Sequence, residues 1–163
     1  MPQTHAPMND SDAHLERTIA LAAENVHDGG GPFGALVVTA EGRAFEGVNR
    51  VTASNDPTAH AEVTAIRAAC TGLGTFDLHG AVLYTSCEPC PMCLGAALWA
   101  RIDRIVFAAD RHDAAAAGFD DAAFYAYFEG DDHRDAMPVA QAETADAVAP
   151  FDAWRANAER TAY

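Results

Sequence analysis

The sequence has 163 residues, half of them hydrophobic, which suits one folded domain of the usual size of about 100–200 residues. It carries 24 acidic and 10 basic residues, a net charge of −14 at pH 7, and every basic residue is Arg. This charge argues against nucleic acid and anionic membranes as partners, since both bind clustered Lys and Arg, and it leaves small neutral substrates as candidates. The N-terminus lacks a secretory signal, so we expect a cytoplasmic protein.

The first predicted element is a helix that follows a flexible polar tail over residues 1–10. Asp10, Ser11 and Asp12 offer N-cap side chains, and a triple glycine at 29–31 ends the helix. Apolar residues recur between them at helical spacing: Leu15, Ile19, Ala22, Ala23 and Val26. We therefore expect one amphipathic helix with these residues on its apolar side.

The central part of the chain alternates between strands and helices. Runs at 33–39 and 43–49, separated by turn residues, predict a β-hairpin. Residues 58–71 contain helix formers and small alanines for close packing, and glycines follow them. A buried strand at 81–85 precedes a helix at 91–100, which begins with a proline. One more strand is predicted at 104–109.

The order of these elements predicts the fold class. Strands joined through a helix favour parallel pairing and a right-handed crossover, whereas a hairpin is antiparallel. We therefore predict an α/β fold of three layers, α/β/α, with a mixed sheet, an N-terminal β-hairpin and covering helices. Short helices at 114–117 and 121–128 and a last helix from Pro150 follow. No linker interrupts residues 11–163, which we expect to form one domain.

Two short motifs carry the chemistry. His60 and Glu62 form a His-x-Glu pair at the start of one predicted helix, and Cys90 and Cys93 form a Pro-Cys-x-x-Cys motif at the start of the next. Either motif alone is a weak indication, because a His-x-Glu pair also occurs as a surface or capping pair. Together they match the signature of the zinc-dependent deaminases.

The residue types explain why this pattern suits zinc. Two thiolates three residues apart lie on one side of a first helical turn, where the helix dipole also favours them. The imidazole of His60 supplies a third ligand and leaves the fourth tetrahedral position to water, as catalytic zinc requires. We expect Glu62 to move the proton of that water, provided that an irregular helix start lets both side chains face the metal.

A structural zinc site is the alternative. Cys70, Cys87, Cys90 and Cys93 could form a closed Cys₄ site, since Cys87 and Cys90 also have ligand spacing. That arrangement would leave His60 without a role and would need Cys70 from the middle of a predicted helix. A zinc-stabilised binding module without catalysis would have such a closed site.

The longer sequence around the motifs resembles the bacterial guanine deaminases, which belong to the cytidine deaminase superfamily. The resemblance runs from about Leu15 to Tyr163. It is carried by these strings: Gly31-Pro32-Phe33-Gly34-Ala35, Asn55-Asp56-Pro57-Thr58-Ala59-His60-Ala61-Glu62-Val63, Thr85-Ser86-Cys87-Glu88-Pro89-Cys90-Pro91-Met92-Cys93, Gly118-Phe119-Asp120-Asp121 and Ala153-Trp154-Arg155. The resemblance implies a cytidine-deaminase-like fold and hydrolysis of guanine to xanthine and ammonia.

The resemblance also implies roles for single residues. Zinc would be held by His60, Cys90 and Cys93, with Glu62 as the proton shuttle and Asp121 as a second catalytic group. Positions matching those that contact the purine in this family are Phe33, Asn49, Ala61 and Tyr163. For two of these residues a plainer role stays open: Asp121 as a helix N-cap and Asn49 as a turn residue.

The resemblance further implies a homodimer in which residues 139–163 form a C-terminal lid exchanged between subunits. Deamination of a related compound stays open as an alternative function: guanosine, cytosine, another aminopurine or an aminotriazine. A tRNA adenosine deaminase has the same zinc motifs, but the charge of −14 and the scattered Arg residues argue against an RNA substrate.

Overall fold

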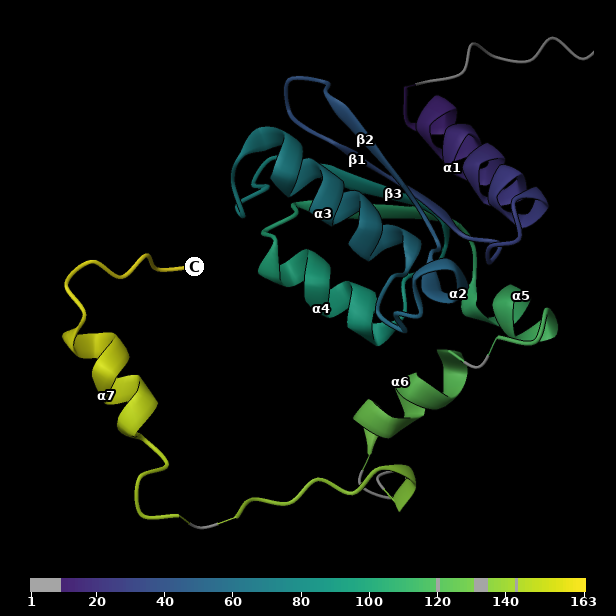
Figure 1. The fold of residues 1–163 in the computed structure, drawn as a ribbon. Helices are drawn as coiled ribbons and strands as arrows, with labels where there is room; N and C mark the ends of the chain where they lie inside the picture. The colour runs from purple at the N-terminus through teal and green to yellow at the C-terminus, as the bar shows by residue number, and fades with distance from the viewer. Residues whose placement is uncertain (1–9, 120, 131–134, 143) are drawn as a thin grey trace, which may run out of the picture. The chain divides into compact units, whose positions relative to one another are not determined.

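The computed structural model describes residues 10–119, 121–130, 135–142 and 144–163 (Figure 1). The elements are, in chain order, α1 (Asp10–His27), β1 (Gly34–Val38), β2 (Ala44–Val48), α2 (Val51–Ser54), α3 (Ala61–Leu73), β3 (Val82–Cys87), α4 (Pro91–Trp99), β4 (Arg104–Ala109), α5 (Arg111–Ala116), α6 (Asp121–Glu129) and α7 (Ala149–Ala156). The predicted tail, apart from residue 10, lies outside the described residues. The chain forms two compact units, one ending at Tyr125 and one covering Ala126–Tyr163.

Four strands in the first unit form one mixed sheet, in the order β2-β1-β3-β4. β1 is antiparallel to both of its neighbours, and β3 and β4 are parallel. The register places Ala35 opposite Gly47 in the hairpin and Val37 opposite Leu83 in the next pair. The predicted mixed sheet with an N-terminal hairpin is therefore confirmed.

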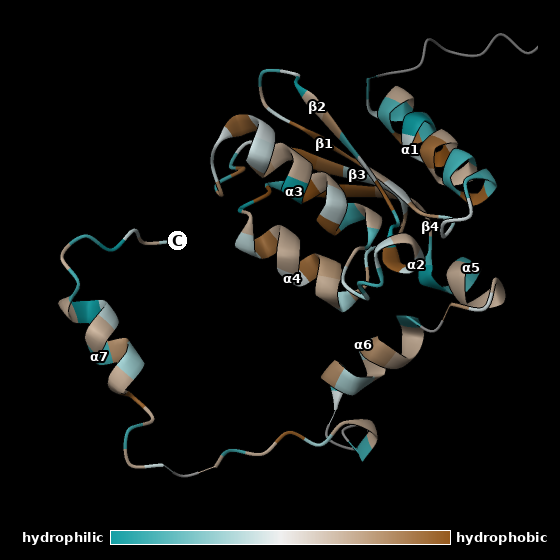
Figure 2. Cartoon of the chain, in the orientation of Figure 1, coloured by the Kyte–Doolittle hydropathy of each residue, from teal (hydrophilic) through white to brown (hydrophobic). Residues whose placement is uncertain are grey.

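Helices cover the two faces of this sheet (Figure 1). α1 packs on β1 and β3 from one face, and α3 packs on β2 and β1 from the other, with α4 beside it. The core between the sheet and α3 includes Ala35, Val37 and Leu83, all without exposed surface. Figure 2 shows the same pattern, with hydrophobic strands between helices whose outer sides are more polar. The predicted three layers are confirmed.

Small residues bring α3 close to the sheet. Ala61, Ala65 and Ala69 are completely buried. A Cβ atom at Gly47 would lie 2.3 Å from the Ala65 backbone nitrogen and 2.4 Å from the Ala61 carbonyl oxygen. Only glycine fits at this position of β2, because side-chain atoms do not approach backbone atoms so closely. The N-terminus of α3, which follows His60, is thereby held against the hairpin.

The buried side of α1 differs from the predicted apolar side. Ile19 and Val26 are 49% and 48% exposed. The buried positions of the helix are Thr18, Leu21, Ala22 and Asn25. The two polar members are hydrogen-bonded, since Thr18 donates to the Leu15 carbonyl and Asn25 donates to two carbonyls outside the helix. Hydropathy alone predicts the buried side only in part, with Ala22 as the shared residue, because a polar group is readily buried when its hydrogen bonds are made.

The start of α3 also differs from the prediction, by three residues. The Asp56 carboxylate accepts hydrogen bonds from the Thr58 backbone nitrogen at 2.8 Å and from its hydroxyl at 2.6 Å. This turn keeps Thr58 out of the helix, and His60 is extended, with φ −68° and ψ 158°. The helix therefore begins at Ala61, and His60 is its N-cap residue.

Two other differences are local. α5 begins at Arg111, because Asp110 and Asp113 form a reciprocal capping box at its start. The single turn of α2 was not predicted; Asn55 ends it in the left-handed conformation, with φ 50°.

Within the described part of the chain, no helix has both the length and the apolar character needed to cross a membrane.

Candidate active site

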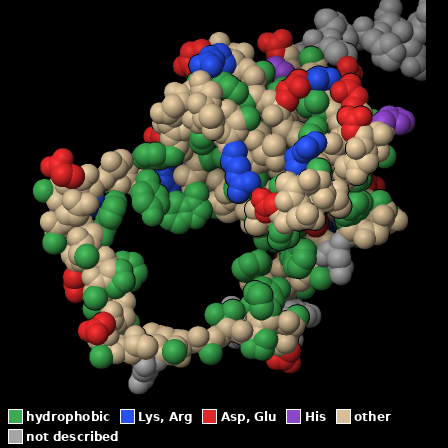
Figure 3. Space-filling model, in the orientation of Figure 1, with side chains coloured by type: hydrophobic (Ala, Val, Ile, Leu, Met, Phe, Trp, Pro, Cys, Tyr) green, Lys and Arg blue, Asp and Glu red, His purple; other side chains and the backbone are tan. Residues whose placement is uncertain are grey.

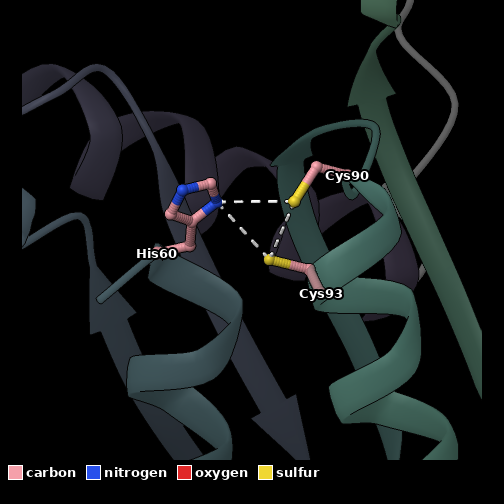
Figure 4. Close-up of side chains that lie close together, drawn as sticks. All are labelled: His60, Cys90 and Cys93. Carbon is pink, nitrogen blue, oxygen red and sulfur yellow. Dashed lines mark hydrogen bonds between the residues drawn. The ribbon is translucent and has the colours of Figure 1, made fainter. Parts of the chain in front are cut away.

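The candidate metal ligands lie at the N-termini of two neighbouring helices. His60 is the N-cap residue of α3, and Cys90 is the N-cap residue of α4, with Cys93 in the first turn of α4. N-cap side chains usually accept a hydrogen bond from a backbone amide of their own helix. Neither His60 nor Cys90 does so. Both side chains are directed instead toward a common point between the helices (Figure 4).

The three ligand atoms have the separations of a zinc site. Each Sγ lies 3.6 Å from His60 Nδ1, and the two Sγ atoms lie 3.6 Å apart. In tetrahedral zinc, with bonds of about 2.3 Å to sulfur and about 2.0–2.1 Å to nitrogen, ligand atoms are about 3.6–3.8 Å apart. The site therefore fits zinc without rearrangement. Among the described residues, this is the one group of three His, Cys or acidic residues close enough to hold a metal.

The charge state of the cluster also suits a cation. The pKa of Cys90 is lowered to about 4, because hydrogen bonds from its neighbours Cys93 and His60 stabilise the thiolate. The same contact with Cys90, together with burial, raises the pKa of Cys93. The pKa of His60 is raised, chiefly by its hydrogen bond to Cys90. A divalent cation can displace the proton that these groups share, since zinc binds thiolates and neutral imidazole.

Glu62 lies beside this cluster and is buried, with 6% of its surface exposed. His60 is outside the helix and Glu62 is in its first turn, so the irregular helix start that lets both side chains face a metal is present. Burial raises the pKa of the Glu62 carboxyl group, and the nearby Cys90 adds to this effect. A buried carboxyl group with a raised pKa is suited to exchange protons near neutral pH.

A cavity of about 380 Å³ opens in front of His60, Glu62 and Cys90. Its volume is within the range of roughly 300–1,000 Å³ that is usual for small-molecule sites. The other lining residues are Gly31, Phe33, Asn49, Val51, Thr52, Glu88, Gly118, Phe119, Asp121 and Phe124. Aromatic rings and a few polar groups next to a metal site suit a flat, polar heterocycle.

Besides Glu62, three of the residues predicted to bind or react with the substrate line this cavity: Phe33, Asn49 and Asp121. Phe33 packs edge-to-face on Phe119, with ring centroids 4.8 Å apart. Asn49 Oδ1 accepts a hydrogen bond from the Val51 backbone nitrogen, so Asn49 also stabilises the turn that follows it. Its Nδ2 has no hydrogen-bond partner among the described residues. Asp121 is the first residue of α6, and the residue before it is outside the described part.

Two predicted contacts are not found in the cavity. The Ala61 side chain is completely buried in the hydrophobic core, so only its backbone could contact a substrate. Tyr163 belongs to the second compact unit, where it packs on Trp154 with ring centroids 6.2 Å apart. Its predicted contact with the purine stays a prediction.

The structure does not bring the four cysteines together as a closed Cys₄ site would need. Cys70 lies near the end of α3, and Cys87 Sγ is 3.7 Å from the Asp110 carbonyl oxygen. Burial raises the pKa of the Cys87 thiol to about 11, so it stays protonated. Cys87 is therefore a packing residue.

Sequence reasoning missed a network behind the zinc-binding loop. Glu88, which lines the cavity, accepts hydrogen bonds from the backbone and side chain of Arg111. The Arg111 guanidinium carbon lies 3.5 Å from the centre of the Tyr125 ring, and the Tyr125 hydroxyl donates to the Pro89 carbonyl. The network ties α5 and α6 to the residue before Cys90. The position of Glu88 next to the Pro-Cys-x-x-Cys motif is the signal that could have revealed it.

Comparison with known proteins identifies the class that this fold and metal site define. The chain matches the cytidine and deoxycytidylate deaminase zinc-binding region over residues 8–109. It therefore belongs to this family of zinc-binding deaminases.

Within the family, the chain is 49% identical to guanine deaminase of Bacillus subtilis (strain 168), over 93% of this chain and 98% of that protein. The X-ray structure of guanine deaminase from Bacillus subtilis has a TM-score of 0.89 and covers 96% of this chain and 99% of its own. A structure of NE0047 in complex with 2,6-diaminopurine is 35% identical, with a TM-score of 0.66 over 70% of this chain and 64% of its own. The tRNA-specific adenosine deaminase of Bacillus subtilis (strain 168) is 35% identical, over 63% of each chain.

Replacing either ligand sulfur should remove the metal. We expect Cys90→Ser and Cys93→Ser to hold well under one zinc per chain, because a serine hydroxyl stays protonated where a thiolate binds. The matched control is Cys87→Ser, which removes a buried sulfur outside the cluster and should keep one zinc per chain. Elemental analysis of the purified proteins measures both. Loss of zinc from Cys87→Ser would instead favour the closed Cys₄ site.

Proposed function

We propose that this protein hydrolyses guanine to xanthine and ammonia. The observation that carries the proposal is a three-residue zinc site with a buried glutamate at the end of an aromatic cavity. It is supported by the near full-length similarity to guanine deaminase, in contrast to the partial match to the tRNA-specific enzyme. Zinc bound by His60, Cys90 and Cys93 supplies an activated water molecule for attack on C2 of the purine.

The protein's own residues then move the protons. The Glu62 carboxylate takes a proton from the attacking water and delivers it to N3 of the ring. As the bond between C2 and the amino nitrogen breaks, the second proton of the attacking water is delivered to that nitrogen, which leaves as ammonia. Asp121, which lines the cavity, would meet the exocyclic amine. One water is consumed for each guanine, and no oxidant or reductant is needed.

Other lining residues would recognise the base. The Nδ2 group of Asn49 donates to an acceptor such as O6 or N7 of guanine, while Phe33 offers a ring surface to the purine. The charged side chains that line the cavity, apart from His60, are Glu62, Glu88 and Asp121, and no Arg or Lys is among the described lining residues. Acidic walls repel phosphate groups, so we infer a free base as the substrate rather than a nucleotide.

Replacing Glu62 tests the proposed function and the shuttle together. Wild-type protein should release ammonia from guanine, and Glu62→Gln should lose about 10²–10⁴-fold or more of this rate while keeping its zinc. Burial raises the Glu62 pKa in the metal-free protein, and in the zinc-loaded enzyme lowering the pH should protonate this base and reduce kcat/KM. Ammonia release and elemental analysis provide the two readouts.

A substrate panel decides between the alternatives. Guanosine, cytosine, 2,6-diaminopurine, an aminotriazine and guanosine monophosphate are assayed beside guanine. Preference for one of these would overturn guanine as the substrate and keep the zinc chemistry. Full activity of Glu62→Gln would refute the shuttle role.

We further propose that the protein is a homodimer in which residues 139–163 of each subunit close the cavity of the other. The proposal rests on the resemblance and on exposed apolar side chains. Leu98 and Trp99 of α4 are 73% and 65% exposed, and Phe151 in α7 is 62% exposed. Figure 3 shows hydrophobic side chains at the surface of α6 and α7. Apolar surface of this kind is typical of an interface.

Complementation between two inactive variants tests the exchanged lid. One variant carries Glu62→Ala with an intact C-terminus, and the other lacks residues 139–163 but keeps Glu62. Each alone should be inactive with guanine. Co-expressed, they should form a heterodimer in which the intact lid of the first covers the functional site of the second, so activity returns. Absence of activity in a purified heterodimer, or full activity of the truncated protein alone, would contradict the exchanged lid.

A further inference from the structure

The side chain of Asn25 connects two walls of the cavity from behind. Asn25 lies near the end of α1 and is 5% exposed. Its Nδ2 group donates to the Gly31 carbonyl oxygen at 2.8 Å and to the Asn49 carbonyl oxygen at 2.9 Å. One amide group thus uses both of its N–H donors on two segments that are distant from each other in the sequence.

Both acceptor residues line the cavity, although Asn25 itself does not. The Asn49 backbone nitrogen donates to the Phe33 carbonyl oxygen at 3.1 Å, and the Phe33 nitrogen donates to Gly31 at 2.8 Å. The Phe33 segment, which provides the ring, and the Asn49 segment, which provides the side-chain amide, are therefore joined directly by a backbone hydrogen bond. The Asn25 side chain joins them a second time. A shift of either segment would break at least one of these hydrogen bonds.

The glycines between α1 and β1 leave room for this arrangement. A Cβ atom at Gly30 would lie 2.3 Å from Asn25 Nδ2, so a larger residue would displace the amide. A Cβ atom at Gly31 would lie 3.0 Å from the side-chain Cγ of Asn49. The glycines therefore do more than end α1, because Gly30 leaves space for the Asn25 side chain and Gly31 for that of Asn49.

A buried amide needs a reason at this position. The neighbouring buried positions of α1, Leu21 and Ala22, are apolar, and burying an amide costs free energy unless its hydrogen bonds are made. The partners of Asn25 are two backbone carbonyls outside its own helix, both at the cavity wall. Thr18, the other buried polar residue of α1, bonds only within its own helix.

We infer that Asn25 is a positioning residue for base recognition: it fixes the Asn49 segment relative to the Phe33 segment, so that amide and ring meet the purine together. The inference rests on the proposed function, in that a purine is the ligand of the cavity. It concerns affinity for the base rather than the proton transfers, because neither the zinc ligands nor Glu62 contacts Asn25 through a hydrogen bond in the described structure.

The test replaces the amide by a group of the same shape. Asn25→Asp removes the double donor and places an acceptor against two carbonyl oxygens. We expect the KM for guanine to rise about 10-fold, the effect of about one lost buried hydrogen bond, while kcat changes less than about threefold. Gly30→Ala places a methyl group against the Asn25 amide and should displace it. This variant should therefore also raise KM, although Asn25 itself is unchanged.

The matched control is Thr18→Ala, which alters a buried polar residue of the same helix and should leave KM unchanged even where the melting temperature falls. Binding of 2,6-diaminopurine is also measured by calorimetry in a Glu62→Gln background, with and without Asn25→Asp, so that affinity is known without turnover. Zinc content and circular dichroism confirm that each variant is folded.

The outcomes separate the two claims. A wild-type protein that binds the purine but does not release ammonia from guanine would overturn the proposed function alone. Purine affinity and KM that are unchanged in Asn25→Asp and Gly30→Ala would overturn the positioning role alone. Loss of stability with unchanged KM would show that Asn25 is only structural.

Discussion

The site depends on two helix N-termini that meet at one point. α3 can approach β2 closely because Gly47 leaves room for its backbone, and α4 begins at Pro91, soon after β3 ends at Cys87. The N-cap position of each helix is given to a metal ligand rather than to a capping side chain. The helix dipoles then favour the thiolates, and the nearby cation lets Glu62 be buried and still ionise. Zinc binding and proton transfer thus follow from one packing constraint.

The rest of the cavity is arranged around this point. Aromatic rings provide flat apolar walls, and acidic residues replace the basic ones that a phosphate would need. The Glu88–Arg111–Tyr125 network holds the loop before Cys90, while Asn25 joins the segments of Phe33 and Asn49 through hydrogen bonds to Gly31 and Asn49. A rigid wall of this kind limits the conformational freedom that a small ligand must remove when it binds.

Much of this was predictable from the sequence, since the zinc ligands and Glu62 lie in short motifs and the strands lie in short runs bounded by turn residues or helices. The less visible parts depend on contacts between distant segments. Asn25 lies outside the apolar stripe of α1, so hydropathy could not place it on the buried side. The turn at Asp56 delays the start of α3 by three residues through a side-chain hydrogen bond, which helix propensity does not represent. Ala61 was expected at the substrate, and its side chain is in the core because β2 passes directly over it.

The central claim is that three protein ligands hold zinc and leave one position to solvent. Zinc X-ray absorption of the wild-type protein tests it most directly, because sulfur and the lighter nitrogen or oxygen ligands differ in distance and scattering. We expect two sulfur ligands at about 2.3 Å and two nitrogen or oxygen ligands at about 2.0–2.1 Å, one from His60 and one from water. Three or four sulfur ligands would show a closed structural site and contradict the account.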